Sequence, residues 1–296
     1  MKHNYLNNKD ILKEIHKSKN TYCWFADPEY SNYDIIVTAN NKGVIPKKDI
    51  LQGRKNRAER LAKAAHELAT ADGTKRKLDE FEIKLKDVKD TDVIFRVMTW
   101  AHVPIDDVKT RKAQEAEEEN PSETEYDDDG DVIPTSKATT KYVKVNFPPF
   151  QHWKINEDGE FYTVGISHWK GDPTTGNYSR DHGGMTNKLA LMFMKLCERY
   201  ATRSNWRGYT YNDEMRSQAL LQLSQIGLQF DESKSQNPFA YYTAAITNSF
   251  TRVLNIEKRN QNLRDDILEM NNLNPSYTRQ GMNSGSWGNG GSSADE

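Results

Sequence analysis

Aromatic, amide and guanidinium side chains recur on one side of a helical pattern in the last third of the chain. The members of this set are Tyr241, Asn248, Arg252, Asn255 and Arg259. Unpaired bases gain about 1–3 kcal/mol by stacking on an aromatic ring. A cluster of positive charge on one helix favours contact with phosphates. These residue types, at this spacing, predict a surface that binds nucleic acid, although a solvated helix face with both tyrosines packed inward is the alternative.

Two helices separated by an Asn-Pro stop must position this surface. Thr210 is a candidate cap for the first helix, whose apolar positions are Met215, Ala219, Leu223 and Ile226. Asn237 is a candidate cap for the second, and Pro238 suits its first position, where the missing N–H costs nothing. The expected buried stripe of the second helix is Phe239, Tyr242, Ile246, Phe250 and Val253.

At these residues the chain resembles a known family. Residues 218–231 are similar to the polymerase-binding helix of region 2 in bacterial sigma factors, and residues 237–254 to the helix that melts and reads the promoter's minus-ten element. The likeness is strongest to the late-promoter sigma factors of T-even-type tailed phages. That family shares a preceding helix, here 187–200, followed by a Gly-Tyr pair, here Gly208-Tyr209, and an N-terminal Tyr-x-Asn-Asn-Lys element, here 5–9.

The resemblance implies a sigma-like transcription initiation factor that binds the host bacterial RNA polymerase core and melts an A/T-rich minus-ten element of late promoters. The implied polymerase-binding residues are Gln218, Leu221, Gln222 and Gln225. The implied DNA-binding residues are Tyr241, Tyr242, Asn248, Arg252, Asn255, Lys258, Arg259 and Arg264. No region-4-like helix-turn-helix is visible after Leu273, so a separate late-transcription co-activator is implied.

The chain departs from the family pattern at two places. Many bacterial sigma factors carry a Trp pair for melting where this chain has Tyr242 and Thr243, so stacking falls to Tyr241 or Tyr242. The phage family usually ends in an apolar, acidic segment that docks on the sliding clamp, whereas residues 281–296 here are rich in Gly and Ser. The sequence therefore leaves open whether this terminus docks on the sliding clamp.

The sequence predicts a mainly α fold, with an all-helical region-2-like domain and an inserted small α+β domain. We expect the following parts: an N-terminal helix and aromatic strap (1–34), the inserted domain (35–173) with a disordered acidic loop (110–140), a linker (174–184), the helical domain (185–280) and a disordered tail (281–296). The inserted domain should hold a helix over 47–71 and strands over 92–100, 141–147 and 160–169, the last preceded by a hairpin turn at 156–159.

Composition and charge narrow the function classes. The chain is polar, with 35% hydrophobic residues and a net charge of −2, so DNA binding through net charge alone is not expected. With two cysteines, no signal-peptide core and no long apolar run, we expect a soluble, intracellular protein with no membrane contact. The resemblance implies that this compartment is the cytoplasm of the infected bacterial host. No metal, cofactor or acid-base constellation stands out, so we expect no catalysis and no cofactor.

Residues 115–131 hold ten acids and no base. A calcium loop fits poorly, because Ser136 stands where a bidentate Glu is needed. A solvated connector and a mimic of DNA that occupies a basic channel remain as alternatives. For the whole chain, the rival to a sigma factor is a polymerase- or virion-associated interaction protein that docks without reading DNA.

Overall fold

The computed structural model describes residues 7–38, 45–73, 77–105 and 142–285. The chain separates into two compact units, each assembled from segments that are distant in the sequence. The sheet unit contains Asn7–Leu189 and Ile226–Pro238, and the helical unit contains Ala190–Gln225 and the chain from Phe239 onward. The expected boundaries at residues 34 and 173 thus fall inside the sheet unit. The acidic run 115–131 and residues 286–296 of the tail lie outside the described residues.

The expectation of a mainly α fold was wrong. The structure is mixed, with 52% of its residues in helices, 13% in strands, and a five-stranded sheet that combines parallel and antiparallel pairs. Three of the five strands were missed in the sequence: β1 (Cys23–Phe25), β2 (Ile35–Thr38) and β4 (Phe150–Ile155). β1 and β2, with three and four residues, are too short to display an alternating pattern, and β4 contains the polar residues Gln151, His152 and Lys154.

The sheet has the order β1-β5-β4-β3-β2. β2 (Ile35–Thr38) pairs parallel with β3 (Phe95–Met98), while β3, β4, β5 (Phe161–Ser167) and β1 pair antiparallel in turn. The parallel pair requires a crossover, and α2 (Lys47–Ala71) forms its helical part. The predicted helix over 47–71 and the predicted hairpin at 156–159 are both confirmed, the turn having Gly159 at φ 82°.

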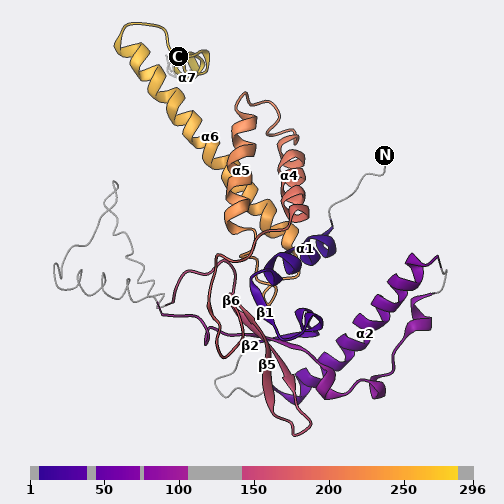
Figure 1. Cartoon of the computed structure of the whole chain (residues 1–296). Coiled ribbons are helices and arrows are strands. Elements are labelled where there is room, and N and C mark those ends of the chain that lie inside the picture. The colour runs from indigo at the N-terminus through magenta and orange to yellow at the C-terminus, as the bar shows by residue number, and fades with distance from the viewer. Residues whose placement is uncertain (1–6, 39–44, 74–76, 106–141, 286–296) are drawn as a thin grey trace, which may run out of the picture. The chain divides into compact units, whose positions relative to one another are not determined.

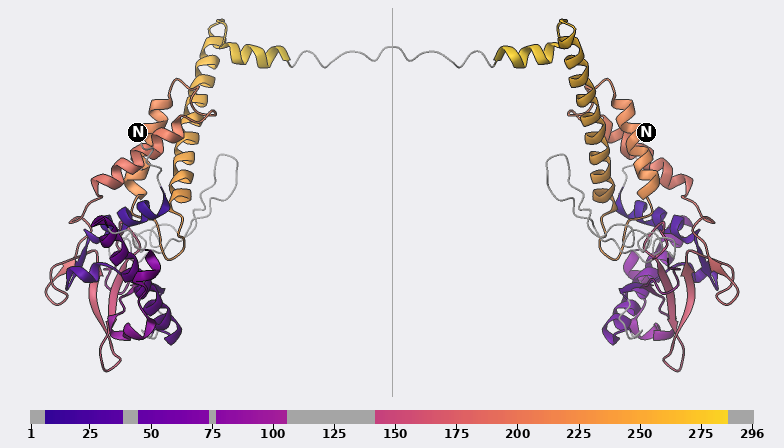
Figure 2. Two further views of the ribbon diagram at one scale, coloured as in Figure 1. Left: turned by 90° about the vertical axis from the view of Figure 1, so that its right-hand side faces the viewer. Right: turned by 90° about the vertical axis from the view of Figure 1, so that its left-hand side faces the viewer.

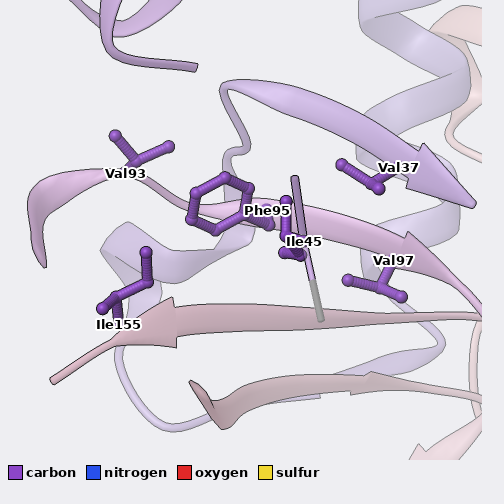
Figure 3. Packing of buried hydrophobic residues seen from close by; sticks show 6 residues of the cluster. All are labelled: Val37, Ile45, Val93, Phe95, Val97 and Ile155. Carbon is purple, nitrogen blue, oxygen red and sulfur yellow. The ribbon is translucent and has the colours of Figure 1, made fainter. Parts of the chain in front are cut away.

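One face of this sheet forms a compact apolar core (Figure 3). Val37, Phe95, Val97 and Ile155 project from three neighbouring strands, and Val93 and Ile45 complete the cluster. α2 approaches closely at Gly53, where a Cβ atom would lie only 2.7 Å from Val93 Cγ1. Since successive strand residues point to opposite faces, Arg96 faces away from this core.

α1 (Asn8–Asn20) is the other major helix of the sheet unit. Asn7 caps it, with its side chain accepting a hydrogen bond from Asp10 N at 2.8 Å, and Ile11 and Ile15 are buried. Two short strands, β6 (Trp169–Lys170) and β7 (Asn177–Tyr178), form a separate ladder. The predicted strand at 141–147 is absent from the described chain, where only an isolated bridge joins Tyr142 to Ile105.

The helical unit is built around α6 (Pro238–Met270), which packs with α4 (Asn187–Ala201) and α5 (Asn212–Ile226). The rings of Tyr242 and Phe193 meet edge to face at 4.8 Å, and Tyr200 Oη lies 2.6 Å from Thr247 Oγ1. The far half of α6 extends past both neighbouring helices and ends beside α7 (Tyr277–Gly285) (Figures 1 and 2).

The expected buried stripe of α6 is confirmed at Tyr242, Ile246, Phe250 and Val253. Phe239, its first predicted member, lies in the first turn and is 36% exposed. α7 covers residues 277–285, so helix occupies the start of the segment that we expected to be a disordered tail. Among the described helices, none combines the length and the apolarity needed to cross a membrane.

Candidate nucleic-acid interface

Five of the eight α6 residues that the sequence assigned to nucleic acid share one face of an uninterrupted helix. Successive α-helical residues are rotated by about 100°, so the following five side chains fall within a sector of roughly 60°. They are Tyr241, Asn248, Arg252, Asn255 and Arg259. Pro238 is the first residue of the helix, and neither Gly nor Pro interrupts the remaining 32 positions. The face is therefore rigid and continuous.

Four of these side chains line a shallow groove. Asn248, Arg252, Asn255 and Arg259 form it together with Thr251 and Ile256. Amide and guanidinium groups donate hydrogen bonds to phosphate oxygens and to base edges. The groove thus offers several hydrogen-bond donors and one apolar contact, Ile256.

The positive charges on this face are available to a ligand. Arg252, Lys258 and Arg259 are exposed and form no ion pair with any other described residue. Lys258 and Arg264 lie outside the groove, because their positions are rotated by roughly 80° and 160° from its centre. The structure thus gathers two of the four predicted basic residues in one place.

The two tyrosines, which the sequence left as alternatives for base stacking, differ in burial. Tyr242 has 0% exposure and contacts the rings of Phe193 and Tyr241, at 4.8 and 5.3 Å between centroids. Its ring belongs to the core and cannot stack on a base in this conformation, so Tyr242 leaves the set of candidate DNA contacts. Tyr241 is half-buried and lies in line with the groove. Burial raises the pKa of its phenol.

The predicted polymerase-binding residues share a face of α5. Leu221 is 53% exposed and Gln225 is exposed, whereas Gln218 and Gln222 are half-buried at the edges of this face. Met215, Ala219 and Leu223 are fully buried on the adjacent side. An exposed leucine flanked by glutamines is a surface on which a protein partner can bury apolar area.

The segment that connects α5 to α6 is fixed by buried charges, which the sequence analysis missed. Glu232 receives two cations: Lys19 Nζ lies 3.1 Å from its Oε1, and Arg96 Nη1 lies 3.1 Å from its Oε2. Lys19 also donates to the carbonyl oxygen of Phe230 at 2.7 Å. The connection is therefore held from two sides, by α1 and by β3.

Arg96 has 0% exposure, and aromatic rings replace its water. Its guanidinium lies 4.0 Å from the ring centroid of Tyr33 and 3.9 Å from that of Phe150. Arg96 Nε donates to His152 Nε2 at 3.0 Å, and His152 Nδ1 donates to Tyr30 O at 2.6 Å. In its neutral form, the imidazole of His152 thus has a hydrogen-bond partner at each of its nitrogens. Burial and the charge of Arg96 hold the pKa of His152 well below its usual range.

The pKa values within this cluster follow from burial and charge. Burial alone would raise the pKa of Glu232, but Lys19 and Arg96 lower it to about 2. Burial lowers the pKa of Lys19, with Glu232 opposing that shift and Arg96 adding to it. For His16, which accepts or donates a hydrogen bond at 2.7 Å with Tyr33 Oη, burial lowers the pKa to about 3. Nothing local in the sequence marks these residues, because they come from four separate segments.

Among the described residues, no group of three or more His, Cys, Asp and Glu side chains is arranged to hold a metal ion. Comparisons with protein-family models, with curated proteins and with solved structures find no match to this chain.

Proposed function

We propose that this chain is a sigma-like transcription initiation factor of a bacteriophage, acting in the cytoplasm of the infected bacterium. In this role, α5 binds the host RNA polymerase core and the exposed face of α6 holds a melted, A/T-rich minus-ten element of late promoters. The observation that carries the proposal is the face of α6. It aligns a half-exposed tyrosine with two amides and two arginines, and those four polar residues line one groove.

The geometry gives each residue a role in this proposal. Tyr241 offers a ring on which an unpaired base stacks, and A/T steps unpair at the lowest cost. Arg252 and Arg259 contact phosphates, while Asn248 and Asn255 hydrogen-bond to the strand between them. With a net charge of −2 on the whole chain, most phosphate contacts must come from the polymerase. A separate co-activator supplies upstream recognition, and docking on the sliding clamp stays an alternative.

Transcription from a linear template is the direct test. Host core polymerase with this chain should start at one defined site on a late promoter, and core alone should not. The rival, an interaction protein that docks without reading DNA, binds core but gives no defined start. Such a result would overturn the proposal.

The α5 surface can be tested separately from DNA. We expect Leu221→Asp to weaken binding to core by about 2–5 kcal/mol, because an unpaired charge would be buried in the interface. Lys195→Glu adds negative charge on the exposed side of α4, away from α5's exposed face, and should bind normally. Competition of each variant with the unmodified chain for a limited amount of core measures both. Equal competition by Leu221→Asp would remove α5 from the interface.

A further inference from the structure

The far half of α6 carries an apolar seam that nothing covers among the described residues. Counting from Tyr242, steps of four and three residues alternate without a break to the end of the helix. The seam positions are Tyr242, Ile246, Ser249, Val253, Ile256, Asn260, Leu263, Ile267 and Met270. An alternation of this kind, repeating every seven residues, is the spacing that packs one helix against another in a coiled coil.

The seam changes from buried to exposed where α6 leaves the bundle. Its first four members are buried, with exposures of 0%, 0%, 6% and 4%. Beyond Val253, the exposure of Ile256 is 48%, that of Leu263 is 59%, and that of Met270 reaches 83%. Figures 1 and 2 show this part of α6 extending past α4 and α5. The same face thus serves packing in one half of the helix and stands in solvent in the other.

α7 packs on the other side of α6 and leaves the seam open. Ser276, which precedes α7, donates to both carboxylate oxygens of Asp265, at 2.8 Å from its N–H and 2.7 Å from its hydroxyl. Arg279 of α7 lies 2.7 Å from Asp266, which borders the seam, and 3.0 Å from Glu269. Asp265 is rotated by roughly 180° from the centre of the seam. α7 therefore supports the helix from behind and at one flank, while Ile256, Leu263 and Met270 remain exposed.

We propose that this seam, from Ile256 to Met270, binds a second copy of the chain as an antiparallel pair of α6 helices. The exposed seam is apolar at Ile256, Leu263, Ile267 and Met270, and a single Asn260 interrupts these positions. A lone Asn at such a position restricts the register and the number of helices at some cost in stability.

The charges beside the seam select a second copy and set its direction. In an antiparallel pair centred between Asn260 and Leu263, Ile256 packs on Ile267 of the second copy. Arg259 then faces Asp266, which also pairs with Arg279 of its own chain, and Glu257 faces Arg264; two-fold symmetry repeats each attraction. In a parallel pair, Arg259 would face Arg264 twice and repel it. Beside the exposed part of the seam, the antiparallel orientation thus places Glu257 and Asp266 opposite bases, whereas the parallel orientation brings two bases together.

Sedimentation equilibrium of the full chain tests this association. A seam of this length should give a dissociation constant of roughly 1–100 μM, because small interfaces form transient complexes. We expect the weight-average mass to rise from monomer towards dimer across that range. A chain that stays monomeric throughout overturns the proposal. Neither DNA nor polymerase is needed, so this result is independent of the proposed function.

Variants locate the contact. Leu263→Glu should weaken the dimer by at least about tenfold, since a charge would be buried twice at its centre. Leu273→Glu makes the same change at a residue of similar exposure, 57%, just beyond the helix, and should dimerise normally. Because both side chains are exposed, the circular dichroism of each variant should match the original. Dimerisation that survives Leu263→Glu overturns the proposal.

Charge reversal fixes the direction. Glu257→Arg and Arg264→Glu should each weaken the dimer by roughly 5- to 10-fold, and the double variant should restore it. In a parallel pair, Arg264→Glu would instead strengthen association by removing the repulsion from Arg259. Strengthening by that variant, or a double variant no better than the single ones, contradicts the antiparallel arrangement.

Discussion

Arginine occurs in two opposite settings in this protein. Arg96, in the sheet unit, has 0% exposure, with aromatic rings on both faces of its guanidinium and Glu232 at its end. Arg252 and Arg259, in the helical unit, are exposed and form no ion pair with the described residues. The first has given up its water for aromatic rings, His152 and Glu232. The other two keep their water, and a ligand can replace it.

The comparison separates structural charge from charge that is free to bind. A buried ion pair gains little over an apolar replacement of the same shape, but the loss of one partner leaves a charge stranded without water. An exposed arginine adds little to stability, and it contributes to binding when it neutralises a phosphate of the nucleic acid and releases the counterions held there. Substitutions in the two regions should therefore change different measurements.

The largest effect should come from Glu232→Ala, which strands both Lys19 and Arg96. We expect a loss of about 3–5 kcal/mol in the free energy of unfolding, measured by urea titration. Glu59→Ala removes an exposed partner, 3.2 Å from Lys63 on the same helix, and should cost about 0.5 kcal/mol or less. Similar losses in the two variants would mean that the buried cluster does not differ energetically from a surface pair.

Neighbouring tyrosines on α6 repeat the comparison within one helical turn. Tyr242→Ala removes a fully buried ring, and we expect it to cost about 3–5 kcal/mol of stability. Tyr241→Ala should change stability far less, but it should slow open-complex formation, because about 1–3 kcal/mol of base stacking is lost from the melted state. Urea titration and a fluorescent base in the minus-ten element separate the two effects. Normal melting by Tyr241→Ala, with core binding intact, would remove it from the interface.

Acid should destabilise the sheet unit. Burial lowers the pKa of His16 and His168 to about 3 and that of His102 to about 4, each from 6.5. Neighbouring cations lower the pKa of Glu232 from 4.5 to about 2. Each folded-state pKa lies below its unfolded value, so the unfolded chain binds more protons as the pH falls. Stability should be complete above about pH 6.5 and decline by several kcal/mol towards pH 3.

Urea titrations at successive pH values measure this decline. His102→Gln removes one proton-linked group and should flatten the profile between pH 6.5 and 4. Lys63→Gln, on the surface of α2, should leave the profile as it is. A stability that does not change with pH over this interval would show that the buried imidazoles do not resist protonation.

The smallest effect belongs to the exposed arginines. Arg252→Gln and Arg259→Gln should leave the urea midpoint unchanged, and each should reduce the salt dependence of promoter binding by about one unit of slope. Lys195→Gln, on the exposed side of α4, should change neither. If either arginine variant unfolded at a lower urea concentration, the charge of that arginine would contribute to stability. The distinction between buried Arg96 and the exposed arginines would then not hold.

Local periodicity was enough to find much of this fold. The spacing of Met215, Ala219 and Leu223 predicted α5, and the residues of 47–71 predicted α2. Asn-Glu-Asp-Gly at 156–159 predicted the β4–β5 turn, because Gly159 supplies the positive φ that the turn needs. The exposed face of α6 was also readable, since an uninterrupted helix fixes the direction of every side chain from its position alone.

Other features were decided only by the tertiary structure. β1 has three residues and becomes a strand because β5 lies beside it, and β4 becomes one between β3 and β5. Whether Tyr241 or Tyr242 is exposed depended on where Phe193 packs. The sequence by itself determined helices, turns and the α6 face, because these follow from neighbours within a few residues. It could not determine that Arg96 is buried, because the partner that makes burial tolerable, Glu232, lies 136 residues away.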